Sequence, residues 1–251
     1  MKIVFFGTPK FVDPVLVKLQ ENYDVTLSVR EPVEFNPEYI EKLRNLNPEL
    51  FLVAAYGQIL PKEVLNIPKM GTINIHPSLL PFYRGASPIQ SAILNGDQKT
   101  GVSFIKMDEE MDHGPVILQF ESGINSDDTF ESLANRLFKE AADQVVEAIS
   151  KVGEAKPQDD SAATFTKILK KEDGMIDINN PPTLEILNRS IRAYYPWPGI
   201  WFEYDLNGKQ TLIKLLPEGR IQVEGKKPMS FKDFKNGYEK GEEVLSKLGL
   251  G

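Results

Sequence analysis

The chain has 251 residues, of which 41% are hydrophobic and 26% are charged, as is typical of a globular protein with a main domain and room for a small companion. A net charge of −7 argues against a generally basic nucleic-acid binder. The chain has no cysteine and only two histidines, which excludes disulfides and cysteine nucleophiles and leaves no metal site to expect.

The first expected strand is Lys2–Phe6, followed by the turn Gly7-Thr8-Pro9. This apolar run is too short for a signal peptide, and no later segment is long and apolar enough to span a bilayer. We therefore expect a cytoplasmic protein, and we expect a monomer. A dinucleotide-binding fold would place G-x-G-x-x-G at this turn, but only one glycine is present and the chain has no P-loop. An enzyme that uses NAD or ATP is therefore disfavoured.

Short apolar runs alternate with helical patterns through the first half of the chain. Helices are expected at residues 11–19, 37–45 and 129–151, and further strands at residues 24–29, 50–56, 72–75 and 101–107. Asp128 and Glu131 form a capping signal for the last of these helices. Strands separated by helices predict parallel crossovers in an open, mostly parallel Rossmann-like α/β sheet, which binds ligands beyond the C-terminal ends of its strands.

The pattern changes in the second half of the chain. Residues 153–166 are polar and irregular, as expected at the exit of a domain, and a helical pattern follows at residues 183–194. Residues 199–216 alternate apolar and polar side chains around Asn207-Gly208, which predicts a β-hairpin, and residues 220–225 are a candidate third strand. The segment after Gly237 is charged and expected to be frayed.

Asn74, His76 and Asp112 form the most interesting polar set. Strand alternation directs positions 74 and 76 to the same side of the fourth strand, and Asp112 lies in the loop after the next strand, where Gly114 permits a tight turn. A carboxylate beside the imidazole would orient it and support its protonated form, while an amide could donate to a developing oxyanion. This combination suits attack of an amine on a carbonyl carbon.

Spacing alone leaves other interpretations of these residues open. Ser78 lies nearby, but nothing activates it as a nucleophile, so direct transfer is favoured over a covalent intermediate. His76 could be a buried structural histidine at a strand end, and His113 a surface residue. The acidic residues could form a solvated rim; they are Asp108, Glu109, Glu110, Asp112 and Glu121.

The stretch from Ile73 to Ile117, INIHPSLLPFYRGASPIQSAILNGDQKTGVSFIKMDEEMDHGPVI, closely resembles the signature region of the folate-dependent formyltransferases. Further stretches are similar to the branch of that family that acts on methionyl-tRNA, rather than to the branch that acts on glycinamide ribonucleotide; they are MKIVFFGTPKF, FTKILKKEDGMID, IRAYYPWPGIWF and GKKPMSFKDFKNGY. The resemblance covers nearly the whole chain.

This resemblance implies an enzyme that transfers the formyl group of 10-formyltetrahydrofolate to the α-amine of initiator methionyl-tRNA for translation initiation. It assigns catalysis to Asn74, His76 and Asp112, and folate binding to the loop of Ser78, Leu79, Leu80 and Pro81. It also implies a catalytic domain at residues 1–166, a connecting segment at 167–198 and a reduced, OB-type β-barrel-like domain at 199–251.

Two parts of the chain depart from the family's pattern. Members usually carry a long basic loop after the second strand that reaches toward the tRNA acceptor stem, whereas this chain passes from Val29 into residues 30–50 with only Arg30 basic before Lys42. The C-terminal barrel is also shortened. The remaining candidates for phosphate contacts are Lys167, Lys170, Lys171, Arg189, Arg192 and Lys214. Two alternatives therefore stay open, a formyltransferase acting on an amino-sugar nucleotide and a catalytically silent folate- or tRNA-binding homologue.

Overall fold

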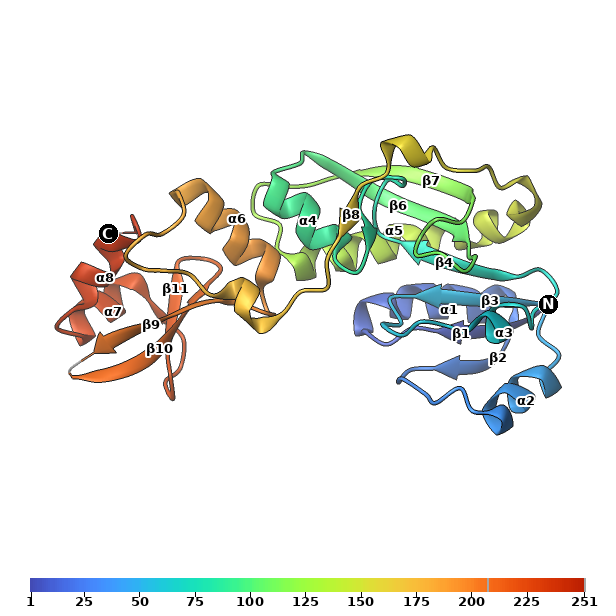
Figure 1. Cartoon of the computed structure of the whole chain (residues 1–251), viewed down its shortest axis with the longest axis horizontal. Helices are drawn as coiled ribbons and strands as arrows, with labels where there is room; N and C mark the ends of the chain where they lie inside the picture. The colour runs from blue at the N-terminus through green and yellow to red at the C-terminus, as the bar shows by residue number, and fades with distance from the viewer. Residues whose placement is uncertain (207, 251) are drawn as a thin grey trace. The chain divides into compact units, whose positions relative to one another are not determined.

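The computed structural model describes residues 1–206 and 208–250, and it divides into two compact units. The first unit comprises Met1–Pro88, Gln98–Gly123 and Leu133–Lys167. The second comprises Ile89–Asp97, Ile124–Ser132 and Ile168–Gly251. Figure 1 shows the elements of both units in the colours of chain order. Asn207, in the predicted hairpin turn, lies outside the described residues.

A six-stranded sheet forms the centre of the first unit, with strand order β2-β1-β3-β4-β6-β7 (Figure 1). Its strands are β1 (Lys2–Phe6), β2 (Asp24–Val29), β3 (Leu50–Ala54), β4 (Thr72–His76), β6 (Lys99–Lys106) and β7 (Val116–Gly123). A separate short pair joins β5 (Arg84–Gly85) to β8 (Phe165–Thr166). The expected open, mostly parallel sheet is thereby confirmed.

The direction of one strand differs from the expectation of parallel crossovers throughout. β1, β2, β3 and β4 are parallel to one another, but β6 runs antiparallel to β4, and β7 runs antiparallel to β6. The short loop of residues 107–115 joins β6 and β7 in a hairpin, which requires their antiparallel pairing. The direction of β6 is set by its pairing with β4, in which Lys106 lies beside Ile73, and it decides from which end of β4 this loop approaches.

Helices cover both faces of this sheet. They include α1 (Asp13–Asn22), α2 (Pro37–Asn45), α3 (Lys62–Leu65) and α5 (Phe130–Ser150), whereas α4 (Pro88–Asn95) falls almost entirely in the second unit. α2 has the predicted bounds, and its start is fixed by Pro37 in the first turn and by Asn36, whose side chain accepts from the Tyr39 N–H at 2.9 Å. α5 buries an apolar stripe that includes Leu137 and Val145.

The long helix α5 begins one residue later than its capping signal predicted. Thr129 and Ser132 form the reciprocal cap: the Ser132 N–H donates to Thr129 Oγ1 at 3.2 Å, and the Thr129 N–H donates to Ser132 Oγ at 3.0 Å. Asp128 instead accepts from the Asn125 N–H at 2.7 Å and from the Ser132 hydroxyl at 2.8 Å, so it stabilises the preceding turn. The Asp128–Glu131 capping signal stays a prediction beside this Thr129–Ser132 cap.

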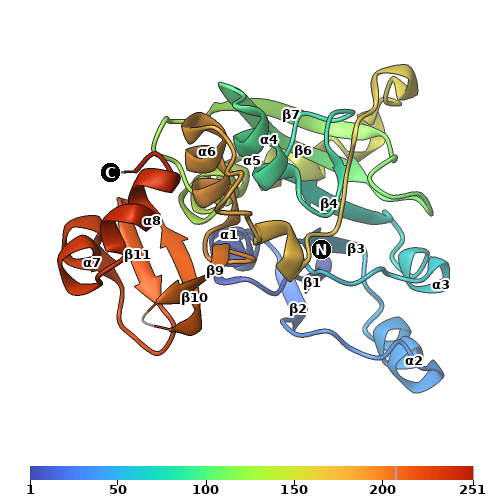
Figure 2. The same cartoon turned by 60° about the vertical axis from the view of Figure 1, so that its left-hand side comes forward.

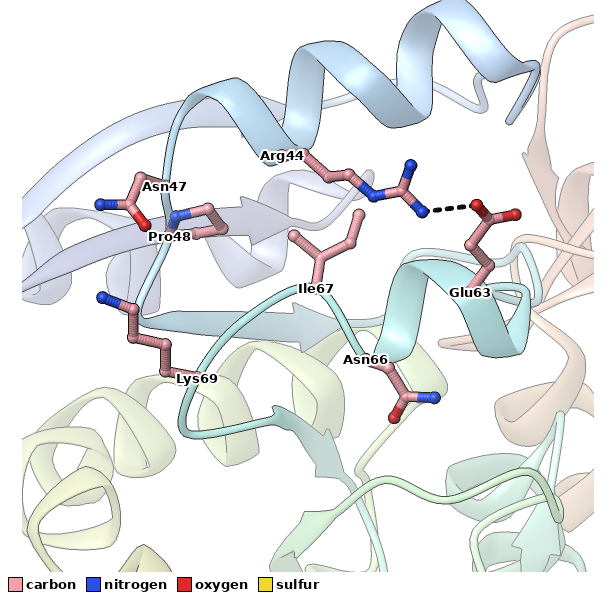
Figure 3. Close-up of a pocket in the computed structure, with 7 residues that line it drawn as sticks. All are labelled: Arg44, Asn47, Pro48, Glu63, Asn66, Ile67 and Lys69. Carbon is pink, nitrogen blue, oxygen red and sulfur yellow. Dashed lines mark hydrogen bonds and ion pairs between the residues drawn. The ribbon is translucent and has the colours of Figure 1, made fainter.

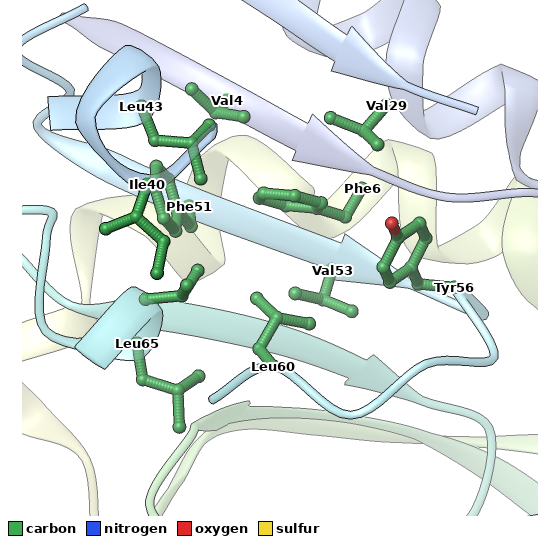
Figure 4. Packing of buried hydrophobic residues seen from close by; sticks show 11 residues of the cluster. Val4, Phe6, Val29, Ile40, Leu43, Phe51, Val53, Tyr56, Leu60 and Leu65 are labelled. Carbon is green, nitrogen blue, oxygen red and sulfur yellow. The ribbon is translucent and has the colours of Figure 1, made fainter. Parts of the chain in front are cut away.

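One hydrophobic cluster lies between the sheet and the helices α2 and α3 (Figure 4). Its members include Val4, Phe6, Phe51 and Val53 from the strands and Ile40, Leu43, Val64 and Leu65 from the helices. The Phe6 ring contacts the rings of Phe51 and Tyr56 edge-on at 5.3 and 5.4 Å between centroids. Each such side chain contributes about 1.5–3 kcal/mol on burial, so this cluster rigidly supports the strands beside it.

The second unit contains a four-stranded antiparallel sheet with strand order β12-β11-β10-β9. β9 (Ile200–Leu206) and β10 (Lys209–Leu216) form the predicted hairpin, with Leu206 paired to Lys209, and β11 (Arg220–Val223) and β12 (Met229–Ser230) follow. The expected small β unit after the main sheet is confirmed. Among residues 1–206 and 208–250 no pairing links β12 back to β9, so these strands form an open sheet.

Three further helices belong to the second unit: α6 (Leu184–Tyr194), α7 (Phe231–Gly237) and α8 (Gly241–Lys247). α7 and α8 lie beside each other next to the small sheet (Figure 2). The expectation of a frayed tail after Gly237 is wrong, because Val244, Leu245 and Leu248 are buried. These apolar residues recur at helical spacing among charged ones and fix α8 by packing.

Within residues 1–206 and 208–250, no helix combines the length and the apolar character that crossing a membrane requires.

Candidate active site

Asn74 and His76 lie on β4, on the face of the sheet that carries the hydrophobic cluster. Asn74 pairs with Val53 of that cluster, and alternation places His76 on the same face, while Ile73 and Ile75 are buried on the other. His76 is only 3% exposed, whereas Asn74 is half-buried. The two polar side chains therefore line a firmly packed strand next to its C-terminal end.

The loop of residues 107–115 brings Asp112 to these side chains from an unexpected direction. The Met107 N–H donates to the Thr72 carbonyl at 2.8 Å, so the loop starts where β4 begins, as the antiparallel β6 dictates. It then reaches along β4 to place Asp112 Oδ1 3.2 Å from Asn74 Nδ2 and 3.4 Å from His76 Nδ1. The structure thus brings the three predicted catalytic residues together.

The path of this loop depends on two unusual backbone positions. Asp112 has a φ of +51°, a conformation that few non-glycine residues adopt. Gly114 is needed for close approach, because a Cβ there would lie 1.9 Å from the Lys106 carbonyl oxygen. The predicted tight turn is therefore present, and its left-handed residue is the aspartate itself. Sparsely populated backbone conformations of this kind concentrate at functional sites.

The Asp112 carboxylate is held from three sides. Burial raises its pKa, but the hydrogen bond and charge of His76, the Gly85 N–H and the Asn74 amide together lower it, and the net effect places the pKa of Asp112 below its ordinary value of 3.8. The Gly85 N–H donates to Oδ2 at 2.8 Å. The carboxylate is thus kept ionised beside the imidazole.

Both ring nitrogens of His76 face acceptors. Nδ1 faces the Asp112 carboxylate, and Nε2 lies 3.0 Å from the Tyr83 carbonyl oxygen. A ring with a proton on each nitrogen can donate to both partners. The His76 ring can therefore hold a proton next to the half-exposed amide donor of Asn74. Such a pair of groups can stabilise an oxyanion and move a proton.

The low pKa of Asp112 predicts a specific dependence of stability on pH. In the unfolded chain Asp112 titrates at its ordinary value of 3.8, so its native contacts contribute stability fully above that pH and lose it as the pH falls through the lower native pKa. We expect the free energy of unfolding of Asp112→Asn to lie below that of the wild type from about pH 5 upward and to converge with it toward pH 2. Urea denaturation across this range measures the difference.

The matched control for this prediction is Asp143→Asn, which makes the same change on the exposed face of α5. Its free energy of unfolding should follow the wild-type curve at every pH. A difference between Asp112→Asn and the wild type that stays constant down to pH 2 would show that the charge of Asp112 does not stabilise the fold.

The predicted folate loop is packed inward. Ser78 is fully buried, and its hydroxyl donates to the Phe82 carbonyl at 2.6 Å. Leu80 is 5% exposed, and its N–H donates to Ser103 Oγ at 3.1 Å. The segment of Ser78, Leu79, Leu80 and Pro81 therefore forms a rigid loop base, and the residue that it presents to solvent is the next one, Phe82, at 49% exposure.

Several contributing residues were missed by sequence reasoning. Tyr83 and Gly85 contact His76 and Asp112 through backbone atoms, for which side-chain identity gives no signal. Arg84 between them is buried, and a lone arginine within the apolar-rich stretch PFYRGASP was an available signal. Gln158, which contacts the backbone of Asp112, lies in the polar stretch interpreted as a domain exit, so no signal marked it.

The predicted phosphate-contact residues fall into distinct settings. Lys171 Nζ lies 5.4 Å from the centre of the Trp201 ring, and Lys214 is the cross-strand neighbour of Trp201 in the β9–β10 hairpin. Both lysines are exposed. The structure thus places two of the predicted cations around one aromatic side chain in the second unit.

The other predicted cations have different surroundings. Arg192 is half-buried and donates to the Asp128 carbonyl at 2.7 Å, and Arg189 of the same helix pairs with Glu185. Lys167 and Lys170 are exposed, on either side of the boundary between the two units. The two arginines are therefore engaged within the fold and are weaker candidates for phosphate contacts than the lysines.

Two surface pockets of the first unit help to delimit the site. One of about 410 Å³ is lined by Arg44, Asn47, Pro48, Glu63, Asn66, Ile67 and Lys69 (Figure 3). Asn47 and Lys69 precede β3 and β4, so this pocket lies where the parallel strands begin, away from His76. A second pocket of about 550 Å³ adjoins the Asp112 loop, whose residues Met107, Asp108, Glu109, Glu110 and His113 contribute to its lining.

Family models and sequence relatives match most of the chain. The model described as formyl transferase matches residues 8–149, and that of the formyl transferase C-terminal domain matches residues 168–219. A methionyl-tRNA formyltransferase of Caldanaerobacter subterraneus is 38% identical over 85% of this chain and 79% of its own length. One of Thermodesulfovibrio yellowstonii is 37% identical over 97% of this chain and 98% of its own length. That alignment has 305 positions against 251 residues here, so the relative has segments without a counterpart in this chain.

Solved structures share the fold at lower identity. A methionyl-tRNA formyltransferase from Clostridium thermocellum has a TM-score of 0.70 at 23% identity, covering 92% of this chain and 99% of its own. A sugar N-formyltransferase from a Shewanella species has a TM-score of 0.68 at 20% identity, covering 87% and 98%. HypX from Aquifex aeolicus in complex with tetrahydrofolic acid has a TM-score of 0.70 at 16% identity, covering 100% and 48%. Given the sequence matches above, the chain belongs to the formyl transferase family, among the methionyl-tRNA formyltransferases.

Proposed function

We propose that the protein is a methionyl-tRNA formyltransferase, which transfers the formyl group of 10-formyltetrahydrofolate to the α-amine of initiator methionyl-tRNA and so supplies formylated Met-tRNA for translation initiation. The observation that carries this proposal is the buried contact of Asn74, His76 and Asp112 in a chain of this family. Residues 1–166 would form the catalytic domain, residues 167–198 the connection and residues 199–251 the reduced β domain.

The three side chains have complementary roles in the proposed reaction. The neutral α-amine attacks the formyl carbon, and negative charge develops on the formyl oxygen as the new C–N bond forms. The second amide hydrogen of Asn74 and the protonated His76 ring stabilise that charge. As the bond from the formyl carbon to folate N10 breaks, His76 gives its Nε2 proton to N10, and the ring then takes up the proton that the amine loses.

Asp112 sets the charge of the ring in this scheme. Its carboxylate holds Nδ1, while the partner of Nε2 is a neutral carbonyl, that of Tyr83. The proton on Nε2 is therefore the less strongly held one and is the proton that we assign to the transfer. Because all three partners of the carboxylate are fixed by β4 and β5, little reorganisation is needed during the reaction.

The surroundings fit a folate, whose pteridine is flat and apolar on its faces. Phe82 and Met111 are 49% and 56% exposed, and in the sequence they directly precede Tyr83 and Asp112, which contact the site. Apolar side chains beside a few fixed polar groups are typical of small-molecule sites. We infer that the rigid base of Ser78, Leu79, Leu80 and Pro81 positions Phe82, rather than contacting the donor through its own side chains.

For the tRNA we propose phosphate contacts by Lys171 and Lys214 around Trp201, with Lys167 and Lys170 as further candidates. Such contacts release counterions, so the apparent affinity for Met-tRNA should fall steeply with salt. Lys171→Ala and Lys214→Ala should each weaken binding and each reduce the slope of log affinity against log salt by about one. Filter binding of Met-tRNA between 50 and 200 mM salt, the range over which such effects are large, measures both quantities.

Lys139→Ala is the matched control, because Lys139 is exposed on α5 in the first unit and has no assigned role in binding. Its affinity and salt slope should equal those of the wild type. A flat salt response of the wild-type protein would instead indicate that the acceptor is not a nucleic acid.

The formylation assay tests the function itself. Purified protein is mixed with 10-formyltetrahydrofolate and offered either Met-tRNA or amino-sugar nucleotides, and the release of tetrahydrofolate is followed. Formylated Met-tRNA supports the proposal. Product from the sugar nucleotide alone would assign the chain to the sugar reaction, and retained binding without turnover would make it a silent homologue.

A further inference from the structure

Arg84 occupies a central position between the two backbone groups that contact the site. The carbonyl of the preceding residue, Tyr83, faces His76 Nε2 at 3.0 Å, and the N–H of the following residue, Gly85, donates to Asp112 Oδ2 at 2.8 Å. Arg84 itself is 4% exposed, although arginine is rarely buried without a specific partner. Its side chain does not reach the reacting groups, so its burial needs another explanation.

The partners of the Arg84 guanidinium lie on the segment of residues 158–160. Nε and Nη2 donate to Gln158 Oε1 at 3.1 and 2.8 Å, and Nη2 also donates to Asp160 Oδ1 at 2.6 Å. These bonds fix the rotamer of Gln158, because its amide oxygen is held at the fork of the guanidinium. The amide nitrogen of Gln158 is thereby directed to the opposite side.

That nitrogen holds the backbone of the catalytic loop. Gln158 Nε2 donates to the carbonyl of Asp112 and to the carbonyl of Gly114, each at 2.8 Å. Both hydrogens of the amide are used on a turn in which Asp112 has a φ of +51°, a conformation that surrounding contacts must maintain. Arg84 thus holds Asp112 twice, through the N–H of its chain neighbour Gly85 and through Gln158.

We propose that Arg84 and Gln158 are positioning residues that fix the Asp112 carboxylate against His76. The pair closes a ring from β5 through Gln158 to the Asp112 loop and back to β5 through Gly85. It connects the Asp112 loop to the segment of β5, whose backbone groups at Tyr83 and Gly85 contact His76 and Asp112. This inference rests on the proposed function for its effect on turnover, but the geometry that it invokes can be measured without any substrate.

Other groups face this region and must be included in any test by pH. The charged neighbours of Asp112 and the pair are His76 on β4 and His113 with Asp108 on the same loop. Asp160 faces both Arg84 and His113. The pKa of His113 is raised from its ordinary value of 6.5 by its hydrogen bond to Asp108, against a smaller effect of desolvation, so a parallel series in a His113→Gln background separates its contribution.

Two substitutions of Gln158 separate its hydrogen bonds with Arg84 from its hydrogen bonds to the Asp112 loop. Gln158→Leu removes both sets of hydrogen bonds at nearly the same size. Gln158→Glu keeps a partner for Arg84 but presents carboxylate oxygens to the two carbonyls, so it cannot donate to them. We expect both variants to lower kcat by about 10- to 100-fold, as for other losses of catalytic alignment, while KM for Met-tRNA is unchanged.

The readout that separates positioning from a general loss of stability is the titration of Asp112. Its ¹³C carboxyl signal, assigned by its disappearance in Asp112→Asn, should titrate at higher pH in both Gln158 variants than in the wild type. A loss of stability alone would lower the folded fraction without moving this midpoint. Gln222→Leu is the matched control, because Gln222 donates to the Lys226 carbonyl at 2.9 Å in the second unit and should leave kcat and the Asp112 midpoint unchanged.

The outcomes decide the proposal in either direction. A raised Asp112 midpoint in both Gln158 variants, with kcat lowered, supports it. An unchanged midpoint in Gln158→Leu, or wild-type behaviour of Gln158→Glu, overturns it even if the wild type formylates Met-tRNA. Should the wild type lack formylation activity, the proposed function fails, and the Asp112 midpoints still decide whether the pair positions the carboxylate.

Discussion

Asp112→Asn is expected to lower kcat for formylation of Met-tRNA by about 10²- to 10⁴-fold, the usual contribution of positioned acid–base groups. The substitution preserves the size of the side chain but removes the charge that supports the protonated His76 ring. The amide can still accept a hydrogen bond from the Gly85 N–H, so the loop should keep its path. Because the carboxylate does not belong to the proposed folate surface, affinity for the donor should be retained.

Steady-state kinetics of tetrahydrofolate release give kcat, and equilibrium binding gives the affinity for the donor. Asp143→Asn on the exposed face of α5 is the control for the substitution and should keep the wild-type kcat. A wild-type kcat in Asp112→Asn would contradict the role assigned to this carboxylate.

His76→Gln is expected to reduce kcat by a similar factor of about 10²- to 10⁴-fold, because glutamine can form hydrogen bonds but cannot carry a proton between the amine and N10. The stronger expectation concerns the double variant His76→Gln/Asp112→Asn. If Asp112 acts through His76, the double variant should be no slower than the slower single variant, since residues that act as a unit are not additive.

A double-mutant cycle in kcat measures this coupling. If the fold-loss in kcat of the double variant equals the product of the two single fold-losses, the two residues act independently. That result would exclude the ion pair, whose Nδ1–Oδ1 distance is 3.4 Å, as the functional link.

Much of the fold could be predicted from the sequence because its signals are local. β1, β2 and α2 have the predicted bounds, since alternation, apolar runs and the Asn36-Pro37 helix start depend only on residues that are consecutive in the sequence. The hairpin of β9 and β10 was predicted equally well. What failed depended on partners elsewhere, as for the buried helix α8 and the antiparallel direction of β6.

The candidate site likewise has residues that could be predicted from the sequence and residues that could not. Asn74, His76 and Asp112 could be named from residue types and strand spacing, and the resemblance to the family strengthened that choice. The contacts that hold them involve the backbone of Tyr83 and Gly85 and the amide of Gln158, 46 positions from Asp112. Backbone groups and distant amides carry no pattern in the sequence, so the support of the site became visible only in three dimensions.

The reduced length of the chain bears on how the tRNA is held. The segment between β2 and α2 is short, and the small sheet of the second unit is open among the described residues. Cations around Trp201 are the proposed contacts with the tRNA in this chain. The salt series with Lys171→Ala and Lys214→Ala therefore examines recognition separately from chemistry.

We expect this protein to formylate the α-amine of Met-tRNA through Asn74, His76 and Asp112. The decisive measurement incubates wild-type protein and Asp112→Asn with 10-formyltetrahydrofolate and Met-tRNA and analyses the amino acid released from the tRNA. Formylmethionine is expected with the wild type, and a rate at least about 100-fold lower with Asp112→Asn. Free methionine alone with the wild-type protein, or equal formylation by the two proteins, would contradict this expectation.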